Sequence, residues 1–220
     1  MPREIRIVTE ESVIPRYAFH ERLCHWLSAL TYVYCLATGL AFYTPYLFWI
    51  AVVLGGGPTS RFWHPIAGLI FFAAAVWMHD IWRRDMEITS TDRRWLDGVK
   101  NYITNRDDLV PPQYRFNAGQ KLFYWVMFYS TILLLVSGLL MWFPELVPFS
   151  YRWIRPAAVI LHECAALITI GAFIIHVYMS LFLVPGSLGA MMRGYVPALW
   201  AKAHHRLWYG QMEGRSPSNK

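Results

Sequence analysis

The chain has 220 residues, of which 56% are apolar, 17% aromatic and only 15% charged. Soluble domains carry about 25% charged residues, so this composition excludes a disordered chain or a coiled coil and argues against an ordinary soluble enzyme. The length corresponds to one domain, or two at most. The formal net charge of +6 would suit a nucleic-acid-binding protein. The placement of the basic residues, described below, argues against that class.

Four apolar stretches are long enough to cross a membrane as helices. They predict spans at about 23–44, 62–79, 122–143 and 156–184, compared with the roughly 20 residues that a bilayer requires. The polar N-terminus lacks the apolar core of a cleavable signal peptide. The predicted fold is therefore an all-α membrane protein, a bundle of four transmembrane helices.

The basic residues are divided unevenly between the two sides of this bundle. Four precede the first span, eight lie between the second and third spans, and five follow the fourth, whereas the other two links hold three. Cytoplasmic segments are enriched in Lys and Arg, so both termini are expected in the cytoplasm. The predicted organisation is an N-terminal segment (1–22), a membrane domain (23–184) and a basic tail (185–220). Topology and anionic lipid then account for the positive charge, and no nucleic-acid partner is needed.

The link between the second and third spans, residues 80–120, carries its own helical pattern. Apolar residues recur at helical spacing and predict an amphipathic helix on the membrane surface or on a partner. These residues are Trp95, Leu96, Val99, Tyr102 and Ile103.

Four histidines are expected to form two pairs at different depths. His162 and His176 lie 14 residues apart on the fourth span. That spacing is about 21 Å of helical rise and nearly four turns, so both lie on one face. His64 begins the second span on the outer side, and His25 begins the first span on the inner side. Spacing and topology thus predict an outer pair, His64 with His162, and an inner pair, His25 with His176.

Two facing imidazoles suit the axial positions of a haem iron. Imidazole also binds zinc, copper and nickel, but a structural zinc site takes four ligands and usually includes Cys. Gly39 and Gly68 lie at helical spacing from the paired histidines and would let a porphyrin approach the backbone. One membrane histidine alone is as well explained by packing or hydrogen bonding. We interpret His79 as interfacial and His204–His205 as solvated or facing a partner.

These motifs together make the chain resemble the cytochrome b-556 (gamma) subunit of membrane-bound respiratory formate dehydrogenases. The order and spacing of the motifs carry the resemblance, which runs from the first span to the tail. The matching stretches are RLCHW (22–26), RFWHPIAG (61–68), NAGQK (117–121), the paired histidines of the fourth span continuing through HVYMS (176–180), and WAKAHHRLWY (200–209).

The resemblance implies two haem b groups and a quinone site. The expected axial ligands are His25 and His176 for the inner haem and His64 and His162 for the outer haem. Menaquinone or ubiquinone would bind next to the inner haem, and the expected contacts are Asn117, Gly119, Gln120 and His176. Asn117 followed by Gln120 is also a capping-box pattern, and a helix cap can still contact a ligand.

The resemblance also implies partners and a direction of electron flow. Electrons would enter from an iron–sulfur (beta) subunit at the periplasmic face of the bacterial inner membrane, while formate is oxidised on a molybdenum- or tungsten-containing catalytic (alpha) subunit. They would pass through the outer and then the inner haem to quinone, and a higher oligomer of the heterotrimer is left open. Two alternatives stay open: the cytochrome b subunit of a membrane-bound hydrogenase, and a haem-free membrane anchor. A transporter is a poor match because broken helices and midplane charges are missing.

Overall fold

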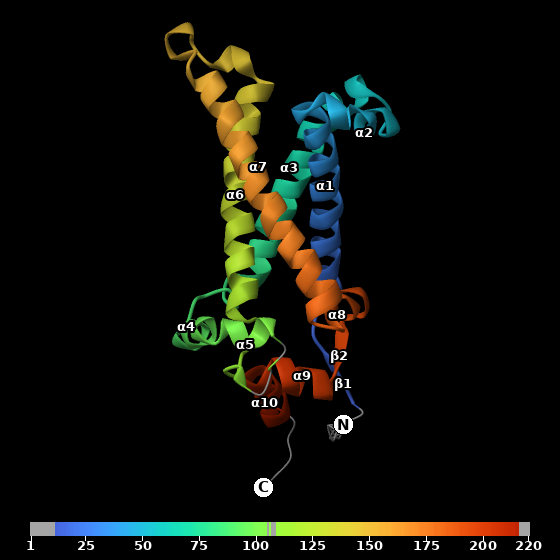
Figure 1. Ribbon diagram of the computed structural model, residues 1–220, viewed down its shortest axis with the longest axis vertical. Coiled ribbons are helices and arrows are strands. Elements are labelled where there is room, and N and C mark those ends of the chain that lie inside the picture. The colour runs from blue at the N-terminus through green and yellow to red at the C-terminus, as the bar shows by residue number, and fades with distance from the viewer. Residues whose placement is uncertain (1–11, 105, 107–108, 216–220) are drawn as a thin grey trace, which may run out of the picture. The chain divides into compact units, whose positions relative to one another are not determined.

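Four long helices dominate the structure, a computed structural model that describes residues 12–104, 106 and 109–215. All four are long and apolar enough to cross a membrane, so each predicted span coincides with a candidate membrane helix. They are α1 (Phe19–Tyr43), α3 (Gly57–Trp82), α6 (Ala118–Trp142) and α7 (Ile154–Tyr178), the last extended by a π turn, η5 (Met179–Leu183) (Figure 1).

Short elements connect the long helices and follow the last of them. Between α1 and α3 lie η1 (Pro45–Leu47) and α2 (Phe48–Val53), and between α6 and α7 lie η3 (Pro144–Leu146) and η4 (Phe149–Tyr151). The remaining elements are β1 (Val13–Pro15), α4 (Ser90–Asp97), α5 (Val99–Ile103), α8 (Ser187–Arg193), β2 (Tyr195–Pro197), α9 (Ala198–His204) and α10 (Arg206–Arg215). Helix α3 already begins at Gly57, before the predicted start of the second span at residue 62.

The chain divides into two compact units. The membrane unit comprises residues 23–81 and 125–174, and the terminal unit comprises the described parts of 1–22, 82–124 and 175–220. Residues 1–11 of the predicted N-terminal segment, 105 and 107–108 of the link, and 216–220 of the predicted tail lie outside the described residues.

The predicted amphipathic helix of the link is wrong in its extent. The segment forms two short helices, α4 and α5, which meet at Gly98. Trp95 and Tyr102 are buried against each other, with ring centroids 5.0 Å apart, and they pack on Ala118 and Val184. The largest apolar residues of the predicted face therefore form a core within the terminal unit.

The tail of the chain is folded onto the N-terminal segment. Strands β1 and β2 pair antiparallel beside α8 and α9 (Figure 1), with Ile14 opposite Val196. Ile14, Val196 and Trp208 belong to one buried apolar cluster. Arg16 lies over the rings of three aromatic residues, Tyr17, Trp200 and Trp208, at 4.9 to 5.2 Å from their centroids. One buried apolar cluster therefore contains residues from the described parts of both the N-terminal segment and the tail.

The prediction that His205 is solvated or faces a partner is wrong, because the side chain is buried in this core. Its Nδ1 lies 2.7 Å from the carbonyl oxygen of Tyr114, and its Nε2 lies 3.0 Å from the guanidinium of Arg16. The carbonyl can only accept and the guanidinium can only donate, so the ring is neutral with its proton on Nδ1. Burial, followed by the positive charge of Arg16, holds the pKa of His205 well below its usual value.

Ion pairs connect segments around the ends of the long helices within the terminal unit, and among them the pair of Lys121 with Asp92 is fully buried. Arg115 pairs with Glu21 at 2.7 Å and with Asp85 at 2.9 Å, and Glu21 also accepts a hydrogen bond from the indole of Trp82. Lys121 pairs with Asp92 at 2.8 Å. A buried charge is costly unless it is paired and hydrogen-bonded, so these partners depend strongly on each other.

Gly194 allows the close approach between β2 and the start of α1. Its φ is +90°, and its carbonyl oxygen accepts hydrogen bonds from the backbone nitrogens of Arg16 and Tyr17. A Cβ at this position would lie 2.8 Å from the carbonyl oxygen of Tyr17. Glycine is therefore required both by the backbone conformation and by the space.

Gly194→Ala is expected to destabilise the terminal unit by about 1–3 kcal/mol, because alanine disfavours positive φ and would clash with Tyr17. The apparent melting temperature of the detergent-solubilised chain measures this change. Gly189→Ala is the matched control, since Gly189 lies within helix α8 and a Cβ there would meet only the flexible guanidinium of Arg193. Equal melting temperatures for the two variants would contradict the prediction.

Candidate functional site

His64 on α3 and His162 on α7 face each other in the membrane unit, as predicted for the outer pair. Their ring centroids lie 6.3 Å apart, with an angle of 56° between the ring planes. Metal–imidazole bonds are about 2 Å long, so an iron atom held by two such rings separates their centres by about 6 Å. The observed spacing therefore fits one metal ion between the two histidines.

In each of these two rings, Nδ1 forms a hydrogen bond with a hydroxyl group from a neighbouring helix. Oγ1 of Thr38 on α1 lies 2.7 Å from Nδ1 of His64, and Oγ of Ser137 on α6 lies 2.9 Å from Nδ1 of His162. With Nδ1 engaged on both rings, Nε2 is the atom available to a metal.

Glycines lie beside the same two rings. A Cβ on Gly39 would be 3.7 Å from Cε1 of His64, and a Cβ on Gly138 would be 3.4 Å from Cε1 of His162. At Gly68 no described atom lies within 4 Å of the position of a Cβ. A flat porphyrin needs small residues beside its axial ligands, so this surrounding fits haem. Gly39 and Gly68 were predicted from spacing, whereas Gly138 was missed.

An aromatic layer with two buried members, Tyr32 and Phe71, lies further along the same helices. Tyr32 of α1 has its ring centroid 5.5 Å from that of Phe71 on α3 and 5.1 Å from that of Phe173 on α7. Phe71 follows His64 by seven residues on the same helix. Seven residues are nearly two helical turns, so the layer lies about 10 Å further along α3 than the histidine.

The two histidines of the predicted inner pair belong to different units. In the membrane unit, His25 on α1 meets the ring of Trp26 edge to face, at 5.2 Å. In the terminal unit, His176 at the end of α7 is stacked on Phe123 of α6, with centroids 4.5 Å apart and planes 9° apart. The pairing of His25 with His176 stays a prediction.

Three of the four predicted quinone residues, Asn117, Gly119 and Gln120, lie at the start of α6, whereas His176 is at the end of α7. The amide of Gln120 donates to Oδ1 of Asn117 at 2.9 Å, and the amide of Asn117 donates to Oε1 of Gln120 at 3.0 Å. This is the capping box that the sequence indicated. Asn117 is buried, and its side-chain nitrogen also lies 3.4 Å from the hydroxyl of Tyr102. A Cβ on Gly119 would lie 3.3 Å from the ring of Trp95, which explains the small residue there.

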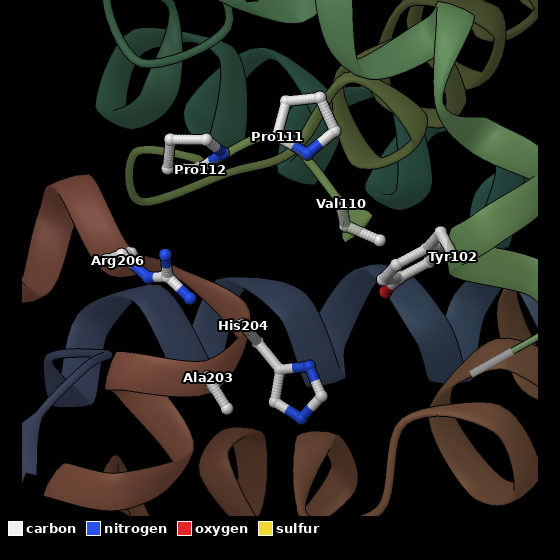
Figure 2. Close-up of a pocket in the computed structure, with 7 residues that line it drawn as sticks. All are labelled: Tyr102, Val110, Pro111, Pro112, Ala203, His204 and Arg206. Atoms are coloured by element: carbon white, nitrogen blue, oxygen red, sulfur yellow. The ribbon is translucent and has the colours of Figure 1, made fainter. Parts of the chain in front are cut away.

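Tyr102 also borders a small cavity within the terminal unit. Figure 2 shows its ring, the imidazole of His204 and the guanidinium of Arg206 around this space. The volume is about 10 Å³. That is room for one water molecule and far too little for a quinone ring. The remaining lining residues are Val110, Pro111, Pro112 and Ala203.

His79 packs among aromatic side chains in the membrane unit. Its ring is stacked on Phe128 at 4.4 Å and meets Trp125 edge to face at 5.9 Å. The His79 side chain therefore packs against aromatic residues of α6.

Comparison with known proteins identifies the family. The model of the prokaryotic cytochrome b561 family matches residues 16–194. The chain belongs to this family. It is 34% identical to the cytochrome b556(fdo) subunit of formate dehydrogenase from Escherichia coli K12, over 90% of this chain and 93% of that protein. It is 29% identical to the cytochrome b556 subunit of formate dehydrogenase from Haemophilus influenzae, over 92% and 84% of the two chains.

These matches confirm the resemblance that the motifs indicated. The nitrate-inducible cytochrome b556(Fdn) subunit of Escherichia coli K12 is also similar, at 29% identity over 94% of both chains. Four helices long enough to span a bilayer fit a multi-pass membrane protein, and membership of the prokaryotic cytochrome b561 family implies haem b.

Proposed function

We propose that the chain is the diheme cytochrome b subunit of a formate dehydrogenase complex in the bacterial inner membrane. The observation that carries this proposal is the outer pair, in which His64 and His162 face each other at 6.3 Å with Nδ1 of each ring held by a hydroxyl. Three similar proteins are named as cytochrome b556 subunits of formate dehydrogenase, and each aligns over most of its length.

Each proposed haem is held by two neutral histidines. His64 and His162 hold the haem nearer the periplasm, and His25 and His176 hold the one nearer the cytoplasm. Haem b bound there supplies one-electron transfer. Lys and Arg are concentrated before α1, between α3 and α6, and after α7, which supports cytoplasmic locations for both termini.

The proposed path takes electrons from the periplasmic to the cytoplasmic side. They arrive from an iron–sulfur subunit, after formate oxidation on a molybdenum- or tungsten-containing subunit, and leave to menaquinone or ubiquinone near the cytoplasmic face. This movement opposes an inside-negative potential by about 2.3 kcal/mol per charge per 100 mV. The donor must therefore have a low potential, and formate meets that requirement.

Haem quantitation tests the central part of the proposal. Pyridine haemochrome analysis of the purified, detergent-solubilised chain is expected to give about two protohaem groups per chain, one for each pair of axial histidines. A chain that binds no haem would be a membrane anchor, and the proposal would be wrong.

The electron donor is tested separately, on the complex purified with its partner subunits. Formate is expected to reduce the haems, and molecular hydrogen is not. Reduction by hydrogen alone would identify the complex as a hydrogenase, the alternative that shares this architecture.

Asn117→Leu is expected to lower quinone reduction about tenfold, which corresponds to the loss of one hydrogen bond to a quinone oxygen. Asn117→Ser is the matched variant, because serine still caps the helix but lacks the amide donor. The rate of quinone reduction by the complex and the melting temperature are measured together. We expect Asn117→Ser to melt like the wild type but to reduce quinone slowly. Wild-type reduction rates in this variant would limit Asn117 to its role as a cap.

A further inference from the structure

Two hydroxyl–glycine dipeptides occupy matching positions at the outer pair. Thr38 and Gly39 on α1 contact His64 of the next long helix, α3, and Ser137 and Gly138 on α6 contact His162 of α7. In both cases the hydroxyl reaches Nδ1 and the glycine lies beside Cε1 of the same ring. The same local device therefore serves both histidines, although the four helices differ in sequence.

The direction of these hydrogen bonds follows from the other contacts of the hydroxyls. Oγ1 of Thr38 lies 2.8 Å from the carbonyl oxygen of Tyr34, and Oγ of Ser137 lies 2.6 Å from that of Leu133. A hydroxyl has one hydrogen, and a carbonyl oxygen can only accept. The hydroxyl hydrogen therefore goes to the carbonyl, and the hydroxyl oxygen accepts from Nδ1–H of the histidine.

The opposite arrangement is unfavourable at both places. If a hydroxyl donated to the ring nitrogen, two oxygen atoms would face each other at 2.8 Å on α1 or 2.6 Å on α6 with no hydrogen between them. Thr38 and Ser137 are both fully buried, so water cannot relieve that contact. Only one direction satisfies all three groups: Nδ1–H donates to the hydroxyl oxygen, and the hydroxyl donates to the carbonyl. This arrangement leaves the lone pair of the imidazole on Nε2.

We propose that Thr38 and Ser137 are the positioning residues of the outer haem site, where they fix the tautomer of His64 and His162 and lower the reduction potential of the iron. The proposal rests on the haem proposed above between these two histidines. A hydrogen bond accepted from Nδ1–H makes Nε2 a more basic ligand, and a more basic ligand favours ferric iron. Removal of either hydroxyl should therefore raise the reduction potential.

The test uses Thr38→Val and Ser137→Ala in the purified full chain, with the midpoint potential of each haem obtained by a spectroscopic redox titration. The loss of one hydrogen bond is expected to change the ferrous-to-ferric ratio of the outer haem about fivefold, an increase of about 40 mV at 59 mV per tenfold change. Thr38→Ser and Ser137→Thr keep the hydroxyl and should stay near the wild-type potential.

Thr131 on α6 supplies a matched control. It is buried, and its hydroxyl donates to the carbonyl oxygen of Met127 at 2.7 Å, as Thr38 does to Tyr34. Thr131→Val therefore removes the same kind of bond within a helix, and we expect it to leave the outer potential unchanged. The proposal is overturned if Thr38→Val and Ser137→Ala leave that potential at the value of Thr131→Val.

Loss of the outer haem would also be decisive. Loss in Thr38→Val, with retention in Thr38→Ser and Thr131→Val, supports the positioning role. Loss of the outer haem in both Thr38→Val and Thr131→Val would indicate a merely structural role and would overturn the proposal. The proposed haem site itself would fail in a different way, namely if the haem content of the His64→Ala variant equalled that of the wild type.

Discussion

His64→Ala and His162→Ala are each expected to halve the haem content, leaving about one protohaem per chain, because a haem that would be held by two histidines needs both. The outer pair is the only one of the two predicted pairs whose members lie in the same described unit, so the expectation stands on observed geometry. Pyridine haemochrome analysis of the purified variants measures the content, and the absorption spectrum identifies which haem is lost.

His79→Ala is the control for the loss of a membrane histidine as such. His79 is stacked on Phe128 and lies next to Trp125, so its removal changes packing on α6 without touching the pair. We expect this variant to keep about two protohaems. Selective loss of the inner haem in His64→Ala would show that the depths assigned to the histidines are wrong.

Lys121→Met is expected to destabilise the protein by about 3–5 kcal/mol, because it leaves the Asp92 carboxylate buried without its partner. The side chains of Lys121 and Asp92 are only 4% and 2% exposed, and the ammonium group also donates to the carbonyl oxygen of Glu87 at 2.8 Å. The apparent melting temperature in detergent measures the loss. Lys121→Met combined with Asp92→Asn should recover part of it, and a double variant as unstable as the single one would contradict the pairing argument.

Low pH should weaken the same ion pair, Lys121 with Asp92. Burial alone would raise the pKa of Asp92, but hydrogen bonds from Lys121 and Thr89 outweigh burial and lower it. A carboxyl group with a lowered pKa contributes stability above its unfolded pKa of about 4, and the contribution is lost as pH falls through the folded value. The wild type should therefore lose stability below about pH 4. In Asp92→Asn this part of the acid dependence should disappear, and an unchanged melting profile would contradict it.

The membrane helices and the outer pair were predictable because the length and the helical spacing of simple sequence features indicate them. The length of each apolar stretch indicates a span, and the 14-residue spacing on α7 places His162 and His176 on one face. The starts of α1, α3 and α6 and the end of α3 were placed too far inside the helices, since hydropathy marks only the apolar part of a helix that continues through polar residues.

The hydroxyl partners could not be predicted in the same way. Whether Thr38 reaches His64 depends on how α1 is rotated against α3, and no spacing within either helix reports that rotation. The only signal was the dipeptide itself, a small hydroxyl residue before glycine, which occurs as Thr38–Gly39 and Ser137–Gly138. Burial of His205 was equally hidden, because it depends on Arg16, which is far away in the sequence.

The aromatic layer of Tyr32, Phe71 and Phe173 has a consequence for energy conservation. Tyr32 and Phe71 are buried, and the rings pack at 5.1 to 5.5 Å. Protons move along chains of water or polar groups, whereas these three rings present mostly apolar surface to one another. In the electron path proposed above, they would therefore hinder a water chain at this level of the membrane unit, so that charge moved by electrons would be less readily returned by protons.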